Sequence, residues 1–375
     1  MLSSVATSLT SLASFASLPS LASVRQRAAA IADDARVLAK LAPALADPYR
    51  PLMAHVVVTR RCNLSCGYCH EYDKTSEPVP FATILERLDH LARLRVVFVT
   101  LTGGESLLHP DIVAIVAAVR ARGMVPAMNT NGYLLTRAHV DALNDAGLFA
   151  MQLSIDALEP GPVTVKALRP LRKKLALLAA HARFRVRINT VLGSGAPEEA
   201  VTVAREVKAL GFDAKCSLVR DGRGKVQPVD ARARAAYDEI DRLGHRAPAY
   251  LSEDFQRALI DRGRVEWKCR AGARYFTVCE DGLVHLCESS WHTPGKPLAS
   301  YGEDDLRAWF HRAKHCAPTC AVAYAHQASR LDAHRAQDSV PTAFTKQSWG
   351  APALVQLRRD RRAADAAHAA VAHAA

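Results

Sequence analysis

Residues 96–132 read VVFVTLTGGESLLHPDIVAIVAAVRARGMVPAMNTNG, and this stretch decides the expected fold. Apolar, β-branched runs at 96–101 and 124–129 predict two strands. The residues between them, 110–122, follow a helical pattern. A strand, a helix and a second strand in this order are typical of a parallel sheet, so the stretch predicts a βαβ unit.

The same alternation runs from residue 55 to about residue 245. Six strand and helix pairs suit an α/β fold, a partial (β/α)6 TIM-like barrel. In such barrels the functional side chains gather at the C-terminal ends of the strands. The predicted strands are 55–59, 96–101, 124–129, 149–154, 184–191 and 212–218, and the predicted helices lie near 81–94, 110–122, 136–146, 164–181, 196–210 and 231–244.

Beyond residue 245 the alternation stops, and residues 245–250 are expected to link the barrel to a smaller C-terminal α+β hairpin domain. Asp281-Gly282 predicts a hairpin turn between strands at 275–280 and 283–288, because glycine readily adopts the positive φ of a tight turn. A helix is expected at 303–313. The predicted domains are a leader over 1–50, the barrel over 51–245, the hairpin domain over 246–325 and a partly disordered tail, alanine-rich at its end, over 326–375.

The leader carries apolar residues at helical spacing, interrupted by Pro19. It is either an amphipathic segment that lies on a surface or a frayed leader, and peripheral membrane contact stays open. No Lys or Arg precedes Arg25, which disfavours an export signal. The sequence contains no run of about 18 apolar residues, so no membrane span is expected.

The composition of the chain excludes several classes of protein. With 375 residues, 49% of them hydrophobic and 23% charged, it is neither a disulfide-stapled miniprotein nor a disordered chain. The net charge of +12 admits an anionic partner, although the basic stretch from Lys166 to Arg187 favours a solvated helix face over an anion-binding surface. Nine clustered cysteines favour metal or cluster binding in a reducing compartment, so we expect a cytoplasmic protein.

Three cysteines, Cys62, Cys66 and Cys69, lie within eight positions directly after the first predicted strand. Thiolates clustered this tightly suit an iron–sulfur cluster or zinc. Three thiolates on a four-iron cluster leave one iron without a protein ligand, and open coordination positions are typical of reactive sites. The loop therefore predicts a reactive metal centre at the mouth of the barrel.

The spacing C-x3-C-x2-C with Tyr68 before the third cysteine, followed after the next strand by Gly103-Gly104-Glu105, resembles the radical SAM superfamily. The resemblance covers about residues 52–245. It implies that the three cysteines bind a [4Fe–4S] cluster whose free iron holds S-adenosylmethionine, that the glycines and Glu105 seat the methionine amino group, and that Tyr68 lies near the adenine. It also places four further side chains at the same mouth, the last two near the ribose: Asn129, Asn131, Ser154 and Asp156.

The resemblance further implies a radical enzyme. A reduced cluster, supplied with an electron by a donor such as flavodoxin or ferredoxin, would cleave S-adenosylmethionine to a 5′-deoxyadenosyl radical. Such a radical removes hydrogen from an unactivated C–H, so the barrel has to hold the substrate close and exclude other hydrogen donors. Peptides and small molecules, anionic ones included, are the substrates that the resemblance suggests.

A second group of cysteines follows the barrel: Cys269, Cys287, Cys316 and Cys320. Their arrangement around a hairpin resembles the SPASM or twitch extension of the same family, which implies an auxiliary [4Fe–4S] cluster bound by these four. A full SPASM domain has a longer cysteine run, and Cys279 is an alternative ligand. A structural zinc site with the same thiolates is the competing hypothesis. Cys216, on the sixth predicted strand, is expected to be a small buried apolar residue.

Other interpretations account for fewer of these features. Residues 66–70 also read C-x-x-C-H, the attachment motif of c-type haem, but this leaves Cys62 unexplained. A zinc or iron–sulfur binding module for an anionic partner such as nucleic acid gives the GGE motif no purpose, and aromatic residues, at 6%, do not alternate with the basic ones. Two segments near the mouth are either solvated loops or substrate contacts: His70, Glu71 and Asp73, and the loop 220–225.

Overall fold

The computed structural model describes residues 35–221, 224–244, 254–290, 293–338 and 341–342. The chain divides into two compact units, residues 1–40 and 41–375, and the elements below belong to the second. Most of the predicted leader, residues 1–34, lies outside the described residues. No helix of the described residues is long and apolar enough to cross a membrane.

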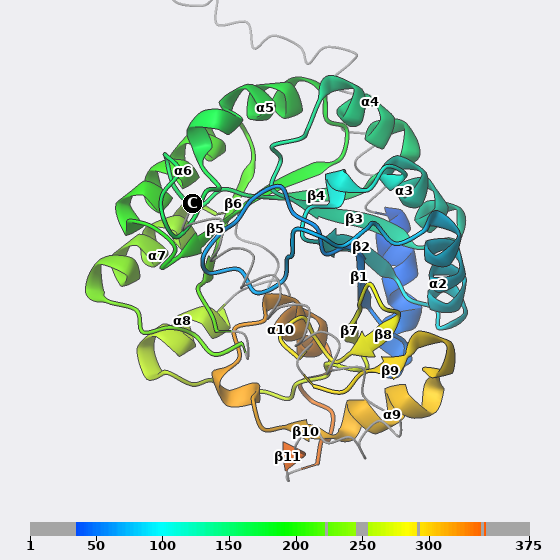
Figure 1. Ribbon diagram of the computed structural model, residues 1–375. Coiled ribbons are helices and arrows are strands. Elements are labelled where there is room, and N and C mark those ends of the chain that lie inside the picture. The colour runs from blue at the N-terminus through cyan, green and yellow to red at the C-terminus, as the bar shows by residue number, and fades with distance from the viewer. Residues whose placement is uncertain (1–34, 222–223, 245–253, 291–292, 339–340, 343–375) are drawn as a thin grey trace, which may run out of the picture. The chain divides into compact units, whose positions relative to one another are not determined.

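Six parallel strands form the main sheet in the order β6-β5-β4-β3-β2-β1. The helices that follow these strands lie along the outer side of the sheet (Figure 1). The sheet is open, so the predicted partial (β/α)6 barrel is confirmed. The strands are β1 Met53–Thr59, β2 Phe98–Gly103, β3 Val125–Thr130, β4 Ala150–Ser154, β5 Arg185–Leu192 and β6 Asp213–Leu218, and the helices are α2 Phe81–Arg93, α3 Ile112–Ala121, α4 Arg137–Ala146, α5 Leu168–His181, α6 Pro197–Ala209 and α7 Ala231–Leu243.

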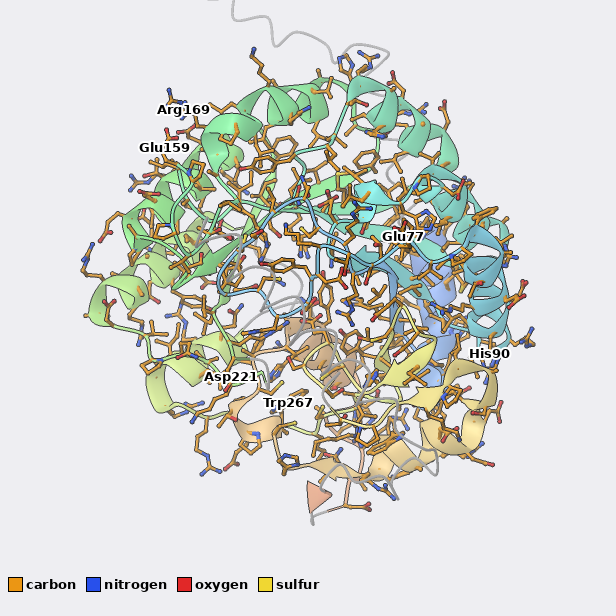
Figure 2. The ribbon with its side chains drawn as sticks, viewed as in Figure 1. Glu77, His90, Glu159, Arg169, Asp221 and Trp267 are labelled. Atoms are coloured by element: carbon orange, nitrogen blue, oxygen red, sulfur yellow. The ribbon has the colours of Figure 1, made fainter. Side chains whose placement is uncertain are left out.

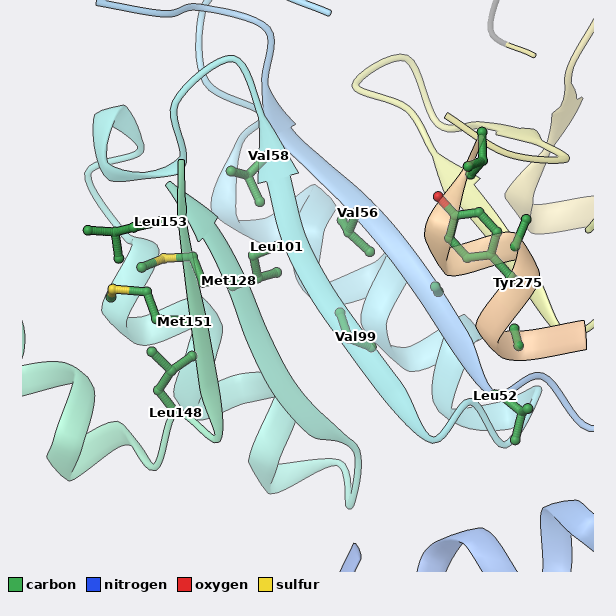
Figure 3. Packing of buried hydrophobic residues seen from close by; sticks show 14 of the residues in the cluster. Leu52, Val56, Val58, Val99, Leu101, Met128, Leu148, Met151, Leu153 and Tyr275 are labelled. Atoms are coloured by element: carbon green, nitrogen blue, oxygen red, sulfur yellow. The ribbon is translucent and has the colours of Figure 1, made fainter. Parts of the chain in front are cut away.

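The strands separate an apolar layer from a polar one. Side chains alternate between the two faces of a strand, and the outward positions pack as the hydrophobic core between strands and helices. Val56, Val99, Leu101 and Met128 belong to this core, which Figure 3 shows from close by. Polar side chains occupy alternate positions and line the interior, as Asn129 does on β3. The interior of the barrel is therefore able to hold a polar ligand.

The predicted hairpin is present and continues the same sheet. β7 (Tyr275–Val278) pairs in parallel with β1, and β8 (Leu283–His285) returns antiparallel to it before β9 (Lys296–Pro297). Gly282 in the turn has φ +81°, as a tight turn requires. The hairpin also shares the hydrophobic core of the barrel. The domain boundary expected near residue 245 lies outside the described residues and stays a prediction.

Short elements complete the C-terminal region. They are α8 Asp254–Arg262, α9 Glu303–His311, α10 Ala323–Arg330, the strand pair β10 Ala313–Lys314 and β11 Pro341–Thr342, and the 3-10 helices η3 Leu298–Ser300 and η4 Ala317–Thr319, while a further one, η1 Ser106–Leu108, follows β2. The helix expected at 303–313 corresponds to α9, whereas α8 and α10 were not predicted. His326 and Ser329 of α10 are buried, so the first residues of the expected tail are packed. Residues 343–375 lie outside the described part of the chain.

One buried arginine ties this region to the start of the barrel. Arg274 is fully buried, and its Nε donates to Asp332 Oδ2 at 2.6 Å. Its Nη1 donates to the backbone oxygens of Ala44, Asp47 and Arg50 at 2.7 to 2.9 Å. A buried guanidinium needs such partners, so these contacts link residues before β1 to the segment after α10.

Candidate active site at the strand ends

The cysteine loop is the segment of residues 60–73 that follows β1. Backbone hydrogen bonds close it, from Cys62 N to Asp73 O at 3.0 Å and from Asp73 N to Arg60 O at 2.9 Å. Within it, Cys69 N donates to Cys66 O at 3.1 Å. Cys66 is buried, whereas Cys62 and Cys69 are half-buried. The loop thus presents three thiols within one short, hydrogen-bonded segment.

The two glycines of the GGE motif allow the end of β2 to touch the start of this loop. A Cβ on Gly103, whose φ is +145°, would lie 1.9 Å from Thr59 O. A Cβ on Gly104 would lie 2.3 Å from Arg60 O. Gly104 N donates to Thr59 O at 2.9 Å. Any larger residue would push the cysteine loop away from the strand ends.

Glu105 joins the ends of β2 and β3. Its buried carboxylate accepts hydrogen bonds from Thr130 Oγ1 at 2.5 Å, Asn131 N at 2.7 Å and Leu107 N at 3.0 Å. Burial raises the pKa of Glu105, and these three donors oppose the rise. Asn131 in turn reaches the cysteine loop, where its Nδ2 donates to Asn63 Oδ1 at 2.8 Å. The Glu105 carboxylate is therefore directed into the protein.

Tyr68 is held by two charged side chains. Its hydroxyl donates to Asp156 Oδ2 at 2.7 Å and accepts from Lys166 Nζ at 3.0 Å. Asp156 is buried and also accepts from Thr164 Oγ1 at 2.8 Å and Val191 N at 3.0 Å. Burial alone would lower the pKa of Lys166, but Tyr68, Asp156 and the neighbouring thiols raise it well above its usual value. Lys166 stays charged beside the cysteine loop.

Lys166 is a site residue that sequence reasoning missed. The helix was expected from residue 164, but α5 begins at Leu168. Lys166 therefore lies in the loop after β4, at the strand ends. A helix predicted to begin at residue 168 would have left this lysine in the loop and marked it as a site residue. Farther along the basic stretch, Arg169 pairs with Glu159 at 3.0 Å on the outer side of the helices (Figure 2), so the prediction of a solvated face is confirmed there.

A cavity of about 210 Å³ opens at the strand ends. Four of the predicted site residues line it: Tyr68, Cys69, Asn129 and Ser154. The other predicted residues of the mouth do not line it, and two of them, Asp156 and Glu105, are buried. Side chains that were not predicted complete the lining, among them Gln152, Lys166, Asn189, Lys215, Ser217, Glu288 and Tyr324.

Arg220 connects the cysteine loop with the hairpin. Its Nη2 lies 2.6 Å from Glu288 Oε1 and 3.3 Å from Glu71 Oε1. The other oxygen of Glu288 accepts a hydrogen bond from Tyr275 at 3.1 Å. The Arg220 guanidinium is thus shared between two carboxylates of the protein itself. Residues 222–223 of the same loop lie outside the described residues.

The remaining predicted ligands surround a second cavity of about 70 Å³, which we call the four-cysteine site: Cys269, Cys287, Cys316 and Cys320. Burial raises the pKa of Cys287 to about 11 and that of Cys316 to about 12, and the nearby thiols add to both shifts. Among the described residues, no three His, Cys, Asp or Glu side chains are close enough to hold a single metal ion. A four-iron cluster spaces its ligands more widely, because each thiolate binds a different iron.

The two other cysteines lie apart from this site. Cys279 is buried at the end of β7, where Arg60 Nη2 lies 3.3 Å from its Sγ, and it does not line the four-cysteine cavity. Its alternative role as a ligand there finds no support in this position. Cys216 is buried in the hydrophobic core, as expected.

Residues 56–218 match the family model described as Radical SAM superfamily. A probable GTP 3′,8-cyclase of Aeropyrum pernix is 35% identical over 246 residues, which cover 58% of this chain and 68% of that protein. The chain belongs to the radical SAM superfamily. The PqqA peptide cyclase of Methylocella silvestris is 26% identical over 272 residues, covering 68% of this chain and 72% of the relative.

A solved structure supports the fold of this radical SAM protein. Streptococcus suis SuiB bound to S-adenosylmethionine superposes with a TM-score of 0.56 at 17% identity, over 71% of this chain and 69% of that one. At this identity the likeness concerns the fold. Membership of the family implies a [4Fe–4S] cluster and S-adenosylmethionine as cofactors.

Proposed function

We propose that this radical SAM protein cleaves S-adenosylmethionine reductively at a [4Fe–4S] cluster bound by Cys62, Cys66 and Cys69. When bound, the cluster and its ligand supply a 5′-deoxyadenosyl radical for hydrogen abstraction. The observation that carries the proposal is the contact between the cysteine loop and the GGE turn at the rim of a polar cavity. Three thiols in one loop fit a cluster that keeps one iron open to a ligand.

The residues around the loop would each have a defined task. Gly103 and Gly104 keep the backbone close to the cysteine loop, and Glu105 fixes the ends of β2 and β3. Lys166 places a positive charge beside the thiols and suits a carboxylate ligand. Ser154 and Asn129 line the cavity and are available to polar groups, whereas Asp156 acts through Tyr68 and Asn131 through the loop.

A peptide is the substrate that we favour, with a small molecule as the alternative. Two of the relatives are named PqqA peptide cyclase and probable GTP 3′,8-cyclase. One SuiB structure contains the bound precursor peptide SuiA. The cavity provides amide and hydroxyl side chains around a space of about 210 Å³. We further propose that a flavodoxin-type or ferredoxin-type donor supplies the electron. Nine clustered cysteines favour a reducing compartment such as the cytoplasm.

For the four-cysteine site we propose an auxiliary [4Fe–4S] cluster of the SPASM or twitch type. Support comes from the four thiols that line one cavity and from their mutual electrostatic influence. Four protein ligands would leave such a cluster coordinatively complete, so it suits electron transfer and structural support. A zinc ion bound by the same residues is the alternative that metal analysis distinguishes.

The test is anaerobic reconstitution followed by measurement of iron, acid-labile sulfide and 5′-deoxyadenosine. Reduced wild-type protein with S-adenosylmethionine should form 5′-deoxyadenosine, and Cys66→Ala should abolish it. Cys316→Ala should lose about half of the iron and keep this cleavage. Cys216→Ala is the matched control and should retain both clusters. Zinc without sulfide in the wild-type protein would contradict the proposal and favour a binding module.

A further inference from the structure

The first turn of α10 brings one tyrosine into the interior of the barrel. The hydroxyl of Tyr324 lies 3.4 Å from Asn129 Oδ1 on β3 and 3.4 Å from Gln152 Oε1 on β4. Asn129 and Gln152 are register partners in the sheet, which places their carboxamides side by side. All three residues line the cavity at the strand ends. We call these three side chains the amide subsite.

The amide subsite keeps hydrogen-bonding capacity for a ligand. The contacts of the Tyr324 hydroxyl with Asn129 and Gln152 are longer than the usual O–H···O distance, and one hydroxyl proton serves only one acceptor well. Among the described residues, the amide nitrogens of Asn129 and Gln152 have no hydrogen-bond partner. A ligand that both accepts and donates hydrogen bonds would complete this arrangement.

The charges of the cavity cancel. Its lining contains the cations Lys166, Lys215 and Arg220 and the anions Glu71, Asp221 and Glu288. Arg220 is paired with two of these carboxylates, and Lys166 is bonded to Tyr68. A strongly anionic substrate, such as a nucleoside triphosphate, would bring negative charge that this lining does not balance. A neutral polar group carries no such penalty.

Tyr324 packs against side chains from two strands. The ring of His55 meets it edge-on at 4.4 Å, and Lys215 Nζ lies 5.8 Å from its ring centroid. Two residues farther along α10, His326 stacks on Phe255 and on Trp267, with ring centroids 3.8 and 3.6 Å apart. A side chain fixed in this way is suited to selecting a ligand, because little freedom is lost on binding.

We propose that Tyr324, with Asn129 and Gln152, binds a neutral hydrogen-bonding group of the substrate, such as a peptide amide, and thereby determines which substrates are accepted. The proposal rests on the proposed function only in treating this cavity as the substrate cavity. It assigns a specificity-determining role to a helix outside the (β/α)6 barrel.

The experiment measures binding of two probes to reconstituted full-length protein with S-adenosylmethionine present: a pool of neutral polar octapeptides, and GTP. Retained peptides are quantified by ultrafiltration and mass spectrometry. Tyr324→Phe should bind the pool about fivefold more weakly than the wild type, as expected for one hydrogen bond. Tyr49→Phe, which removes a hydroxyl that contacts His311 away from the cavity, should bind like the wild type.

A second variant tests the charge argument. Gln152→Glu should lose neutral peptides and gain affinity for octapeptides that contain lysine. Equal binding by Tyr324→Phe and the wild type, tighter retention of GTP than of neutral peptides, or no retained peptide at all would each overturn the proposal. Formation of 5′-deoxyadenosine by the wild type without peptide is measured in parallel, so a failure of the proposed function is recognised separately.

Discussion

The two cysteine sites of this protein differ in how the chain assembles them. The cysteine loop draws three thiols from one short segment and lies beside a polar cavity of about 210 Å³. The four-cysteine site draws its thiols from three separate segments around a cavity of about 70 Å³. The first depends on local backbone hydrogen bonds, and the second on tertiary packing. The site that we expect to react with a ligand thus lies beside the larger cavity, and the other surrounds a smaller one.

The largest expected effect concerns the stability of the C-terminal region that contains the four-cysteine site. Arg274→Met removes a fully buried guanidinium and leaves Asp332 and three backbone oxygens without that donor. We expect the free energy of unfolding to fall by about 3–5 kcal/mol, measured by denaturant titration of the metal-free protein. Arg335 contacts the same carboxylate, but its side chain is 32% exposed. Arg335→Met should therefore lower the free energy of unfolding by less than about 1 kcal/mol. Equal losses would contradict this account.

A substitution that creates a backbone clash should affect the cysteine loop and leave the four-cysteine site intact. Gly104→Ala places a Cβ against Arg60 O and should displace the cysteine loop. After reconstitution, we expect about half of the iron to be lost and 5′-deoxyadenosine formation to disappear, while the four-cysteine site still fills. Gly302→Ala is the control, since its Cβ meets no atom within 4 Å. Full iron content in Gly104→Ala would show that the close approach is not needed.

A smaller effect should appear in how the free energy of unfolding depends on pH, through a histidine beside the four-cysteine site. His326 bonds Cys320 O at 2.9 Å, and burial lowers its pKa from 6.5 to about 3. Below pH 6.5 the unfolded histidine binds a proton and the folded one does not, so stability falls with decreasing pH. The slope approaches about 1.4 kcal/mol per pH unit.

The measurement is the free energy of unfolding between pH 7 and pH 5, within the range set by those two pKa values. His326→Gln should flatten the slope, because glutamine donates to Cys320 O without titrating. His334→Gln, at an exposed position, should leave the slope unchanged. An unaltered slope in His326→Gln would mean that other groups cause the acid sensitivity.

The smallest expected effect concerns the reactivity of a thiol in the cysteine loop. Burial raises the pKa of Cys69, and the ammonium of Lys166 opposes that rise. Lys166→Met should therefore slow alkylation of Cys69 by iodoacetamide at pH 8.5 by about threefold in the metal-free protein. Peptide-resolved mass spectrometry measures the rate. Lys173→Met, on the exposed face of α5, should not change it.

Much of the barrel and of the cysteine loop was predictable because their signals are local. The six strands and six helices appear close to their predicted bounds, and the GGE motif lies against the cysteine loop. Other features depended on contacts between distant segments. A helix predicted to start too early concealed Lys166, and the pairing of β7 with β1 gave no sequence signal. Tyr324 belongs to α10, a helix of eight residues, which is shorter than the window over which a helical period is recognised.

The sequence by itself determined the alternation of strands and helices and the three thiols of the cysteine loop, since hydrophobic period and cysteine spacing act over neighbouring residues. Only the tertiary structure decided which side chains share the cavity. It set Tyr324 against β3 and β4, and it drew the four cysteines of the second site together. The reason is that these contacts join residues far apart in the chain, and the packing of the complete core fixes them.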